Sequence, residues 1–287
     1  MKPIIYAIAL CLIGSSGIVM ADVAHSIPRP LALGLQHYNY ADADIDGSNA
    51  ELSMNYTQLK LPIGKWTFSD YIFVPTLSLE QTSFEVKNDS NAGNPDLYTA
   101  KAQFMFIKKL DDKWMRIIQI APSMHTDGNA LDEDAYSLMG LAIWKYESSE
   151  TSAWTMGVGA NRLFGEYKPI PLISYQYRPS LKTQIDLGFP ITKFEHSFNK
   201  NFTGFAAIKP VGGNWRFQSQ TDEKVNVSYS SWIASSGVRF QFKPKMWASL
   251  ELGQSLARKF DINDDDQTGE VDIDNSPTIM FSIGLHP

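Results

Sequence analysis

The feature that most constrains the fold is the alternation of apolar and polar residues along residues 168–190. Side chains of a β-strand point alternately to its two faces, so this pattern predicts two strands with one mostly apolar and one mostly polar face. We expect a tight turn centred on Pro179, which pairs Tyr177 with Leu181. Such a hairpin needs an apolar partner on one side and tolerates water on the other.

A second hairpin, centred on Pro244, repeats the pattern. Its apolar face pairs Val238 with Leu250, and its mixed polar face carries Arg239 and Glu251. Helical periodicity is absent after residue 22, where turn residues and acidic loops separate short alternating segments. The chain beyond its N-terminal segment is therefore predicted to be all-β.

The N-terminal segment has the pattern of a secretory signal peptide. Lys2 precedes an apolar run at residues 4–13, and small residues lead to a cleavage site after Ala21. Residues 14–17, Gly-Ser-Ser-Gly, interrupt the apolar run, which disfavours a membrane-spanning anchor. The one cysteine of the chain, Cys11, lies in this segment. The exported part therefore has no disulfide to stabilise it.

Composition narrows the class of protein. The formal net charge is −6, which argues against nucleic acid as a partner, and aromatic residues make up 12% of the chain. No later stretch approaches 18 consecutive apolar residues, so no transmembrane helix is expected. Closed β-barrels span membranes with alternating strands whose apolar face is outside and whose polar face lines the lumen. We expect residues 22–287 to form one such domain in the outer membrane of a Gram-negative bacterium.

The predicted fold is a closed antiparallel transmembrane β-barrel of about 14 strands. Two candidate strands contain a proline, at Pro75 and Pro190. Fourteen strands result if both run on, 16 if both break, and 12 if residues 202–219 lie partly outside the wall. The candidate strands are 31–40, 50–61, 66–86, 98–108, 113–125, 135–147, 153–163, 170–177, 181–199, 202–209, 214–219, 227–242, 245–256 and 278–286.

The connections between these strands are of two kinds. Short turns such as 62–65 and 243–245 alternate with longer polar loops such as 41–49 and 260–277. Short periplasmic turns and longer extracellular loops are typical of outer-membrane barrels. Because closure pairs the first strand with the last, we expect loops 41–49 and 260–277 to be neighbours on the outer side.

A family resemblance agrees with this interpretation. Residues 168–190, followed by Gly204-Phe205-Ala206 and by Val211-Gly212-Gly213-Asn214-Trp215, resemble an uncharacterised family of bacterial outer-membrane β-barrel proteins, a domain of unknown function. The resemblance covers nearly all of the chain after the signal peptide. It implies the barrel fold and brings no catalytic residues with it.

The partners expected for such a barrel are outer-membrane lipid, lipopolysaccharide and the barrel-assembly machinery. Ile279, Phe281, Ile283 and Leu285 alternate as a last strand should. Outer-membrane barrels usually end on an aromatic residue used in assembly, whereas this sequence ends on Pro287.

One cluster has the composition of a hydrolase site. His196 and Ser197 follow Glu195 in a pattern that faintly resembles the signature of outer-membrane lipid A deacylases. Adjacent residues of a strand point to opposite faces, whereas a serine nucleophile and its histidine base must lie within hydrogen-bond reach. We therefore predict no catalytic residues.

Two acidic loops have part of the pattern of a cation site. Asp42, Asp44, Asp46 and Gly47 match the first half of a calcium loop, but Ser53 stands where its final glutamate belongs. No bound cofactor is expected apart from Ca²⁺ or Mg²⁺ between these surface loops, and solvated acidic loops are the alternative. The candidate ligands are Asp42, Asp44, Asp46, Asp261, Asp264 and Asp265.

The predicted lumen-lining residues carry charges of both signs, which does not indicate a strongly ion-selective pore. We predict a pore or channel for small solutes without enzymatic activity. The alternatives are a lipid-modifying outer-membrane hydrolase and a periplasmic β-barrel binding protein with an inward apolar core. The lumen-lining set is Lys101, Gln103, Asn161, Gln184, Asp186, Arg239 and Glu251.

Overall fold

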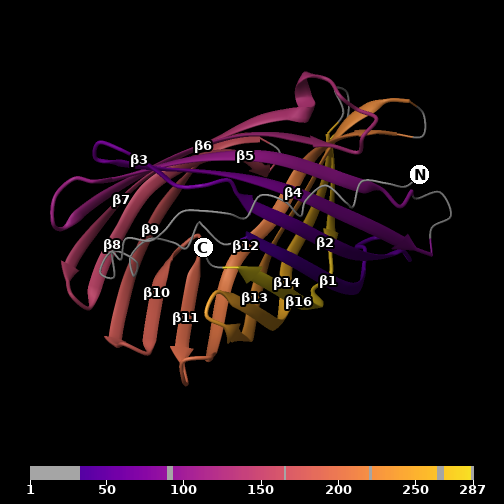
Figure 1. Cartoon of the computed structure of the whole chain (residues 1–287). Helices are drawn as coiled ribbons and strands as arrows, with labels where there is room; N and C mark the ends of the chain where they lie inside the picture. The colour runs from indigo at the N-terminus through magenta and orange to yellow at the C-terminus, as the bar shows by residue number, and fades with distance from the viewer. Residues whose placement is uncertain (1–32, 89–92, 165, 220–221, 264–267, 286–287) are drawn as a thin grey trace. The chain divides into compact units, whose positions relative to one another are not determined.

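The computed structural model describes residues 33–88, 93–164, 166–219, 222–263 and 268–285, and the predicted signal peptide lies outside these ranges. The described residues form sixteen strands and one short 3₁₀ helix, η1 (Figure 1). The bounds are β1 Leu33–Asp44, β2 Glu51–Pro62, β3 Trp66–Phe68, β4 Tyr71–Lys87, β5 Asp96–Lys109, β6 Trp114–Thr126, η1 Glu133–Ala135, β7 Tyr136–Ser149, β8 Ser152–Phe164, β9 Glu166–Ser180, β10 Thr183–Phe189, β11 Thr192–Ser197, β12 Phe202–Gln218, β13 Lys224–Lys243, β14 Met246–Asn263, β15 Thr268–Ile273 and β16 Ser276–Leu285.

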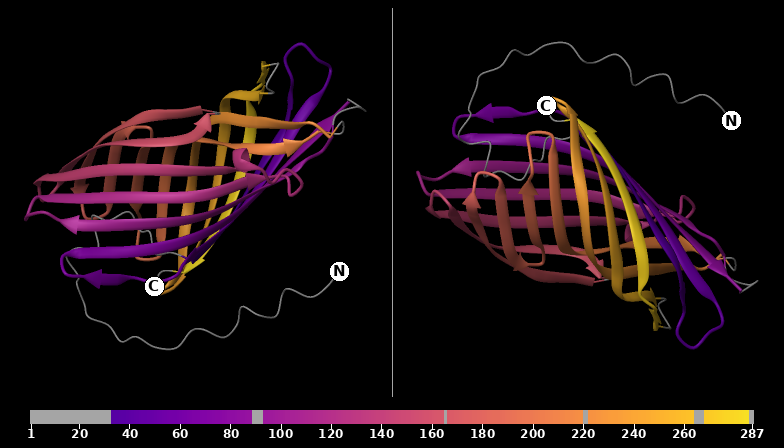
Figure 2. Two further views of the ribbon diagram at one scale, coloured as in Figure 1. Left: turned by 90° about the horizontal axis from the view of Figure 1, so that it is seen from above. Right: turned by 90° about the horizontal axis from the view of Figure 1, so that it is seen from below.

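Strand pairing closes the sheet into a barrel of 14 antiparallel strands. Each wall strand pairs with the next along the chain, and β1 pairs with β16 from Leu33↔Leu285 onward. The two remaining segments lengthen the wall strands: β3 continues β2 alongside β4, and β15 continues β16 alongside β14. Because the barrel is closed, each terminal strand has a neighbouring strand on both sides, as predicted from the sequence. The two views of Figure 2 show the strands as one curved wall.

The strand count is confirmed, but the assignment behind it differs. β4 runs through Pro75, whose missing N–H is accommodated because the strand opposite it bulges at residues 63–65. The chain turns at Pro190, so the candidate strand 181–199 is two strands, β10 and β11. Candidates 202–209 and 214–219 are instead one strand, β12. Neither the twelve-strand nor the sixteen-strand alternative holds for the wall.

The predicted register of the hairpin at Pro179 is wrong. Its turn lies at Leu181 and Lys182, so Tyr177 pairs with Ile185 instead of Leu181. Proline fits an extended strand as well as a turn, so Pro179 was a misleading indicator of the centre of the turn. From Ile185 to Phe189 the register shift is even, so these residues and their partners keep their predicted faces. The register around Pro244 is confirmed, with Val238↔Leu250 and Gly237↔Glu251. Another predicted turn, 62–65, is the bulge before β3, and the chain turns at Ser69 and Asp70.

The outer surface of the barrel carries a belt of exposed apolar side chains. Among the described residues, no helix is long and apolar enough to cross a membrane. The inner face of the same strands carries ion pairs such as Arg239–Glu195. This arrangement is that of a transmembrane barrel and is the reverse of a periplasmic barrel with an apolar interior and a polar outer face. Belt residues include Leu77, Leu79, Leu187, Phe189, Phe194, Val238, Phe240, Leu250, Leu252, Ile279 and Phe281.

Part of the barrel extends beyond this belt at the end opposite the two terminal strand ends. Along the outer face of β4, Leu77 and Leu79 give way to Gln81, Ser83 and Glu85. Because the inner face of this extension is apolar, its two sides pack together and fill the lumen. We call this part the cap. Its core consists of Tyr40, Ala43, Leu52, Met54, Phe84, Leu97, Trp215, Tyr229, Ile233, Ile273 and Met280.

Aromatic contacts connect the two sides of the cap. The ring of Phe84 lies edge-on to Trp215 at 6.2 Å, to Tyr229 at 5.9 Å and to Phe260 at 5.3 Å between ring centroids. Such pairs add to the free energy gained from burying the rings. The cap core therefore fills the capped end of the lumen, beyond the membrane belt.

Candidate functional site

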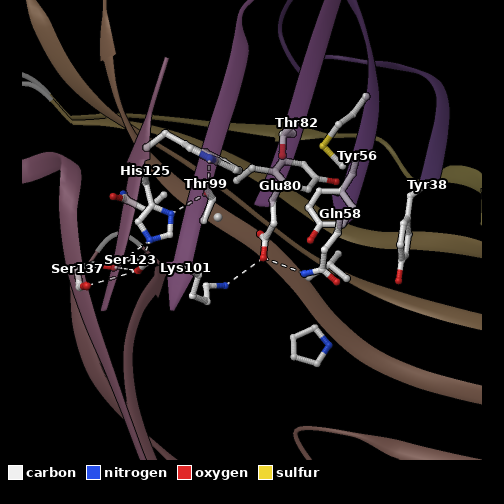
Figure 3. A pocket seen from close by; sticks show the side chains of 18 of the residues that line it. Tyr38, Tyr56, Gln58, Glu80, Thr82, Thr99, Lys101, Ser123, His125 and Ser137 are labelled. Atoms are coloured by element: carbon white, nitrogen blue, oxygen red, sulfur yellow. Dashed lines mark hydrogen bonds and ion pairs between the residues drawn. The ribbon is translucent and has the colours of Figure 1, made fainter. Parts of the chain in front are cut away.

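A cavity of about 360 Å³ lies in the lumen next to the cap core (Figure 3). One side of its lining comes from the inward faces of β1, β2, β4, β5, β6 and β7, and the other side comes from β12 and β13. Alternate residues of each strand reach it, since inward side chains recur with period two. Glu80 and Thr82 of β4 and Thr99 and Lys101 of β5 are examples.

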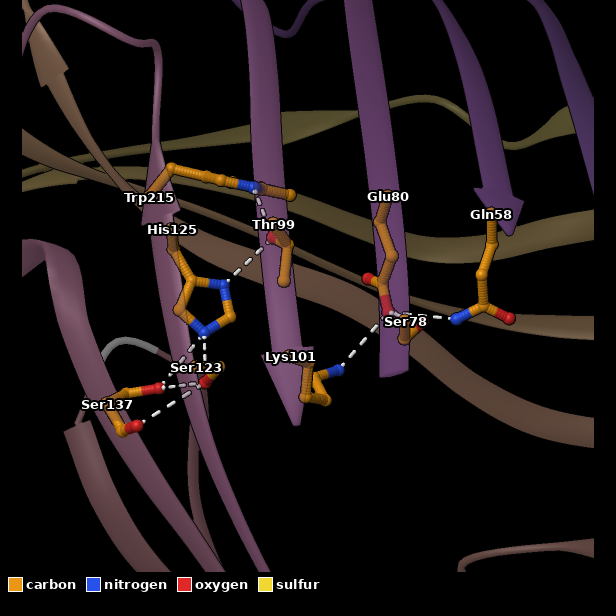
Figure 4. Close-up of polar contacts among 9 residues, drawn as sticks. All are labelled: Gln58, Ser78, Glu80, Thr99, Lys101, Ser123, His125, Ser137 and Trp215. Atoms are coloured by element: carbon orange, nitrogen blue, oxygen red, sulfur yellow. Dashed lines mark hydrogen bonds and ion pairs between the residues drawn. The ribbon is translucent and has the colours of Figure 1, made fainter. Parts of the chain in front are cut away.

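One polar group of the cavity centres on Glu80. Its carboxylate Oε1 accepts hydrogen bonds from Gln58 Nε2 at 2.8 Å and Ser78 Oγ at 3.1 Å, and it pairs with Lys101 Nζ at 3.3 Å (Figure 4). Removing an ion pair from water costs desolvation free energy, and these hydrogen bonds to Glu80 help to offset that cost. The group therefore presents one negative and one positive charge side by side on the cavity wall.

A second polar group centres on His125. Its Nε2 lies 2.8 Å from Ser123 Oγ and 3.0 Å from Ser137 Oγ, and its Nδ1 lies 3.0 Å from Thr99 Oγ1 (Figure 4). Trp215 Nε1 donates to the same Thr99 hydroxyl at 3.2 Å. The chain of bonds links the β5–β7 wall to β12 and fixes the imidazole in the cavity lining.

Ser123 and His125 have the distance of a nucleophile and its base, but the atom facing Nδ1 is a hydroxyl. In hydrolytic triads the partner there is typically a carboxylate or amide, and a carboxylate stabilises the imidazolium that forms during the reaction. The Thr99 hydroxyl orients the ring without supplying that charge. The geometry favours a hydrogen-bonding wall that presents hydroxyl and imidazole groups to a solute.

Aromatic side chains line the opposite part of the cavity. Tyr38 and Tyr56 pack edge to face with ring centroids 5.3 Å apart, and Lys209 Nζ lies 5.3 Å from the centroid of the Tyr38 ring. Lys209 also pairs with Glu251 at 3.5 Å. A lining of aromatic surfaces with a few fixed polar groups is typical of sites that bind small molecules.

Six of the seven lumen residues predicted from the sequence lie on the inner wall in the part of the chain whose side chains are described. Lys101 lines the cavity, and Glu251 bonds Lys209 and Ser235. Deeper toward the terminal ends, Arg239 pairs with Glu195 at 3.2 Å. Asp186 accepts from Gln184 Nε2 at 2.8 Å and from Gln176 Nε2 at 2.8 Å. Gln103 shares the face of Lys101 by alternation, and the side chain of Asn161 lies outside the described residues.

His196 and Ser197 have separate partners. His196 Nδ1 lies 2.9 Å from Thr183 Oγ1, whereas Ser197 Oγ lies 3.1 Å from Thr203 Oγ1. The pair that does meet, Ser123 and His125, was not predicted from the sequence. Their spacing of two residues within one predicted strand placed them on the same face and was the signal available.

The two acidic loops are neighbours at the cap. Asp46 N donates to Asp272 O at 3.0 Å, and Asp274 N donates to Asp44 O at 3.0 Å. Asp42 is occupied by Lys87, whose Nζ lies 2.8 Å away. Asp264 and Asp265 lie outside the described residues. Within the ranges that the structure describes, no group of three or more histidine, cysteine, aspartate or glutamate side chains is placed to hold a metal ion.

The loop between β6 and β7 fastens the end of β12 across the lumen. Asp127 N donates to Arg216 O at 3.2 Å, and Asp132 Oδ2 lies 3.2 Å from Arg216 Nε and 3.4 Å from Lys224 Nζ. Partial burial opposes ionisation of Asp132, but Arg216 and Lys224 outweigh it and hold the pKa of this carboxyl below its usual range. The loop thereby ties β12 to β6, where Arg216 pairs with Thr126.

Comparisons with known proteins agree with the fold. A family described as a domain of unknown function (DUF6268) matches residues 37–285. No curated protein sequence matches the chain. An outer membrane channel from Pseudomonas putida F1 is similar with a TM-score of 0.53 and 11% sequence identity, covering 93% of this chain and 100% of that chain. The toluene transporter TodX from Pseudomonas putida gives a TM-score of 0.42 and 10% identity, covering 91% and 90%.

These similarities concern the fold. The value of 0.53 shows a shared barrel architecture, and the value of 0.42 is too low to support an argument. The closed 14-strand wall and its apolar belt make the chain an outer-membrane β-barrel.

Proposed function

Because the chain belongs to the DUF6268 family of outer-membrane β-barrels, whose function is unknown, we propose from its own structure that it is a channel for small solutes. The lumen cavity is the observation that carries the proposal. It combines one paired carboxylate and ammonium, a histidine with three hydroxyl neighbours, and tyrosine rings within about 360 Å³. The fold similarity to an outer membrane channel supports the same function.

The cavity lies on the solute path in this proposal, next to the closed cap. Its lining carries two carboxylates, of Glu80 and Asp134, and two ammonium groups, of Lys101 and Lys209, so neither sign is in excess. The fixed hydroxyl and imidazole groups around His125 offer hydrogen bonds to a solute's polar groups. The tyrosine rings offer apolar faces. Solutes that have both kinds of surface fit this lining best.

We propose that the protein has no enzymatic activity. The supporting observation is that the hydroxyl of Thr99 occupies the position at His125 Nδ1 where an acyl-transfer triad usually has a carboxylate or amide. An unchanged lipopolysaccharide after prolonged incubation with the purified barrel is the expected outcome. Release of fatty acid that disappears in Ser123→Ala would instead establish the hydrolase alternative.

The proposed partners are outer-membrane lipid and lipopolysaccharide around the belt and the barrel-assembly machinery during insertion. We propose no bound cofactor, with Ca²⁺ or Mg²⁺ at the acidic loops of the cap as the one exception. Calorimetric titration with Ca²⁺ tests this exception, because an Asp44→Asn and Asp46→Asn double variant should then bind less. Equal heats from both proteins would eliminate the cation site.

Single charge substitutions in the cavity test whether ions pass it. Lys101→Gln leaves the Glu80 carboxylate uncompensated, so the reversal potential in a salt gradient should shift toward cation selectivity. Glu80→Gln should shift it toward anions. The control is Lys87→Gln, which breaks the exposed pair with Asp42 on the cap surface and should leave selectivity unchanged. Identical reversal potentials in all four proteins would place the conducting path elsewhere.

A further inference from the structure

The barrel wall is shorter along the strand direction at β10 and β11 than elsewhere. These strands have seven and six residues, the fewest of the fourteen wall strands (Figure 1). β9 pairs with β10 only as far as Ile173↔Phe189, and β12 pairs with β11 only as far as Ile208↔Thr192. Beyond these pairs, β9 residues 166–172 and β12 residues 209–218 have no strand pairing between them in the described part of the chain. The wall therefore has a gap between β9 and β12.

Prolines lie on both sides of this gap. β9 carries Pro169 and Pro171 in the part that pairs with β8 but no longer with β10, and β12 carries Pro210 two residues after its last pair with β11. Proline has no N–H to donate to a neighbouring strand, so it occurs at strand edges and blocks further pairing. The sequence thus keeps these two edges from joining each other or accepting another strand.

An apolar cleft of about 170 Å³ occupies the gap. The inner faces of β7 and β9 contribute Leu141 and Leu172, and the outer faces of β12 and β13 contribute Pro210 and Trp232. These faces meet because the β6–β7 loop holds the end of β12 across the lumen. Every residue that lines the cleft is apolar. Phe189, at the lower edge, is 44% exposed on the membrane belt, so the cleft lies at the level of the bilayer.

The cleft adjoins the lumen cavity. Met139 and Pro210 line both spaces and form the partition between them. The capped end of the lumen is filled by the cap core, in which Trp215 and Phe84 are 4% and 3% exposed. A solute that moves between the cavity and the surrounding membrane would therefore meet less packed protein at the cleft than at the cap.

We propose that this cleft is a lateral portal that takes the unbranched alkyl chain of an amphipathic solute while its polar end occupies the lumen cavity. The portal deepens the proposed channel function and rests on it. Apolar cavities of roughly 150 Å³ stay dry and take up small hydrocarbons, so the cleft has the size and lining for an alkyl segment. A polar end would find partners in the cavity at Glu80, Lys101 and His125.

Trp232 is a built-in reporter of occupancy. The chain has seven tryptophans, so the quenching assigned to the cleft is the difference between the wild type and Trp232→Phe. The probe is 11-bromoundecanol, whose bromine quenches indole fluorescence on contact, added to the barrel in vesicles of unbrominated lipid. We expect saturable quenching of Trp232 that undecanol reverses by competition. Probe dissolved in the bilayer would instead quench in proportion to its concentration and without competition.

Substitutions that fill the cleft should remove the saturable part of the Trp232 quenching. A Cβ built at Gly159 has Leu141 Cδ1 as its nearest neighbour at 3.4 Å, so Gly159→Leu can place its side chain in the cleft. We expect at least a fivefold loss of the saturable component. Leu172→Phe, which fills the cleft from β9, is the second variant if the first does not fold. The matched control is Gly269→Leu on β15, where a Cβ meets nothing within 4 Å, and it should quench like the wild type.

Two results would overturn the portal. One is quenching of Trp232 that is linear in probe and unaffected by Gly159→Leu. The other concerns vesicles of lipid brominated on its acyl chains. If Gly159→Leu removes the quenching of Trp232 only in these vesicles, membrane lipid fills the cleft. Osmotic swelling of proteoliposomes that contain the same wild-type protein is recorded in parallel with small uncharged solutes. Swelling without saturable quenching eliminates the portal alone, and absence of swelling eliminates the channel function itself.

Discussion

Val238→Arg is expected to destabilise the barrel in a lipid bilayer by about 2–4 kcal/mol if Val238 lies near the bilayer midplane, and less toward the interfaces. Val238 is 39% exposed on the outer face of β13, where it pairs with Leu250, another belt residue. An arginine there must place its charge in hydrocarbon or bend away toward the head groups. Equilibrium unfolding by denaturant from lipid vesicles measures the change in free energy.

Two controls separate the lipid face from the lumen face. Val238→Leu keeps the position apolar and should change the free energy of unfolding by less than about 0.5 kcal/mol, as is usual for surface substitutions. Arg239→Gln, one residue on, loses its lumenal pair with Glu195 but keeps a polar side chain in water, so it should cost less than Val238→Arg. If Val238→Arg is harmless while Arg239→Val prevents folding, the two faces are inverted and the membrane assignment is wrong.

Phe84→Ala is expected to lower the free energy of unfolding by about 3–5 kcal/mol, the range for removing a buried phenylalanine ring. Phe84 is 3% exposed, and its ring is the one that contacts Trp215, Tyr229 and Phe260 together. Its loss leaves a cavity between the two sides of the cap. Thermal or denaturant unfolding of the refolded barrel measures this change.

The matched control is Glu85→Ala on the same strand. Glu85 is exposed on the outer face of the cap, so its truncation should change the unfolding free energy by no more than about 0.5 kcal/mol. A similar small effect for both variants would show that the cap interior is not packed as described.

The alternation of residues was sufficient to predict the wall and its two faces. Val238 and Arg239 lie on the faces that the sequence assigned, because inversion of a strand would turn its apolar row into the polar lumen and its charged row into lipid. Closure was also predictable, and β1 pairs with β16. The Pro179 hairpin was not, since its register depends on which residues form the turn, and Leu181 and Lys182 carry no strong turn signal.

The cap and the cavity could not be predicted from the sequence because their contacts join distant segments. Trp215 bonds Thr99 across 116 positions, and local alternation shows only that each faces inward. Whether an inward aromatic side chain contacts water or the opposite wall depends on how β12 bends. The ion pair between Arg216 and Asp132, which are far apart in the sequence, fixes that bend. Residues 202–209 and 214–219 were predicted as two short strands, although they belong to one long strand, β12.

Solute permeation through the purified wild-type barrel in proteoliposomes distinguishes a channel from a barrel that is closed to solutes. We expect osmotic swelling with small uncharged solutes, at a rate that rises in Phe84→Ala because the cap core then blocks the capped end of the lumen less completely. Folded barrel that produces no swelling above protein-free liposomes with any solute, in either protein, would contradict the channel.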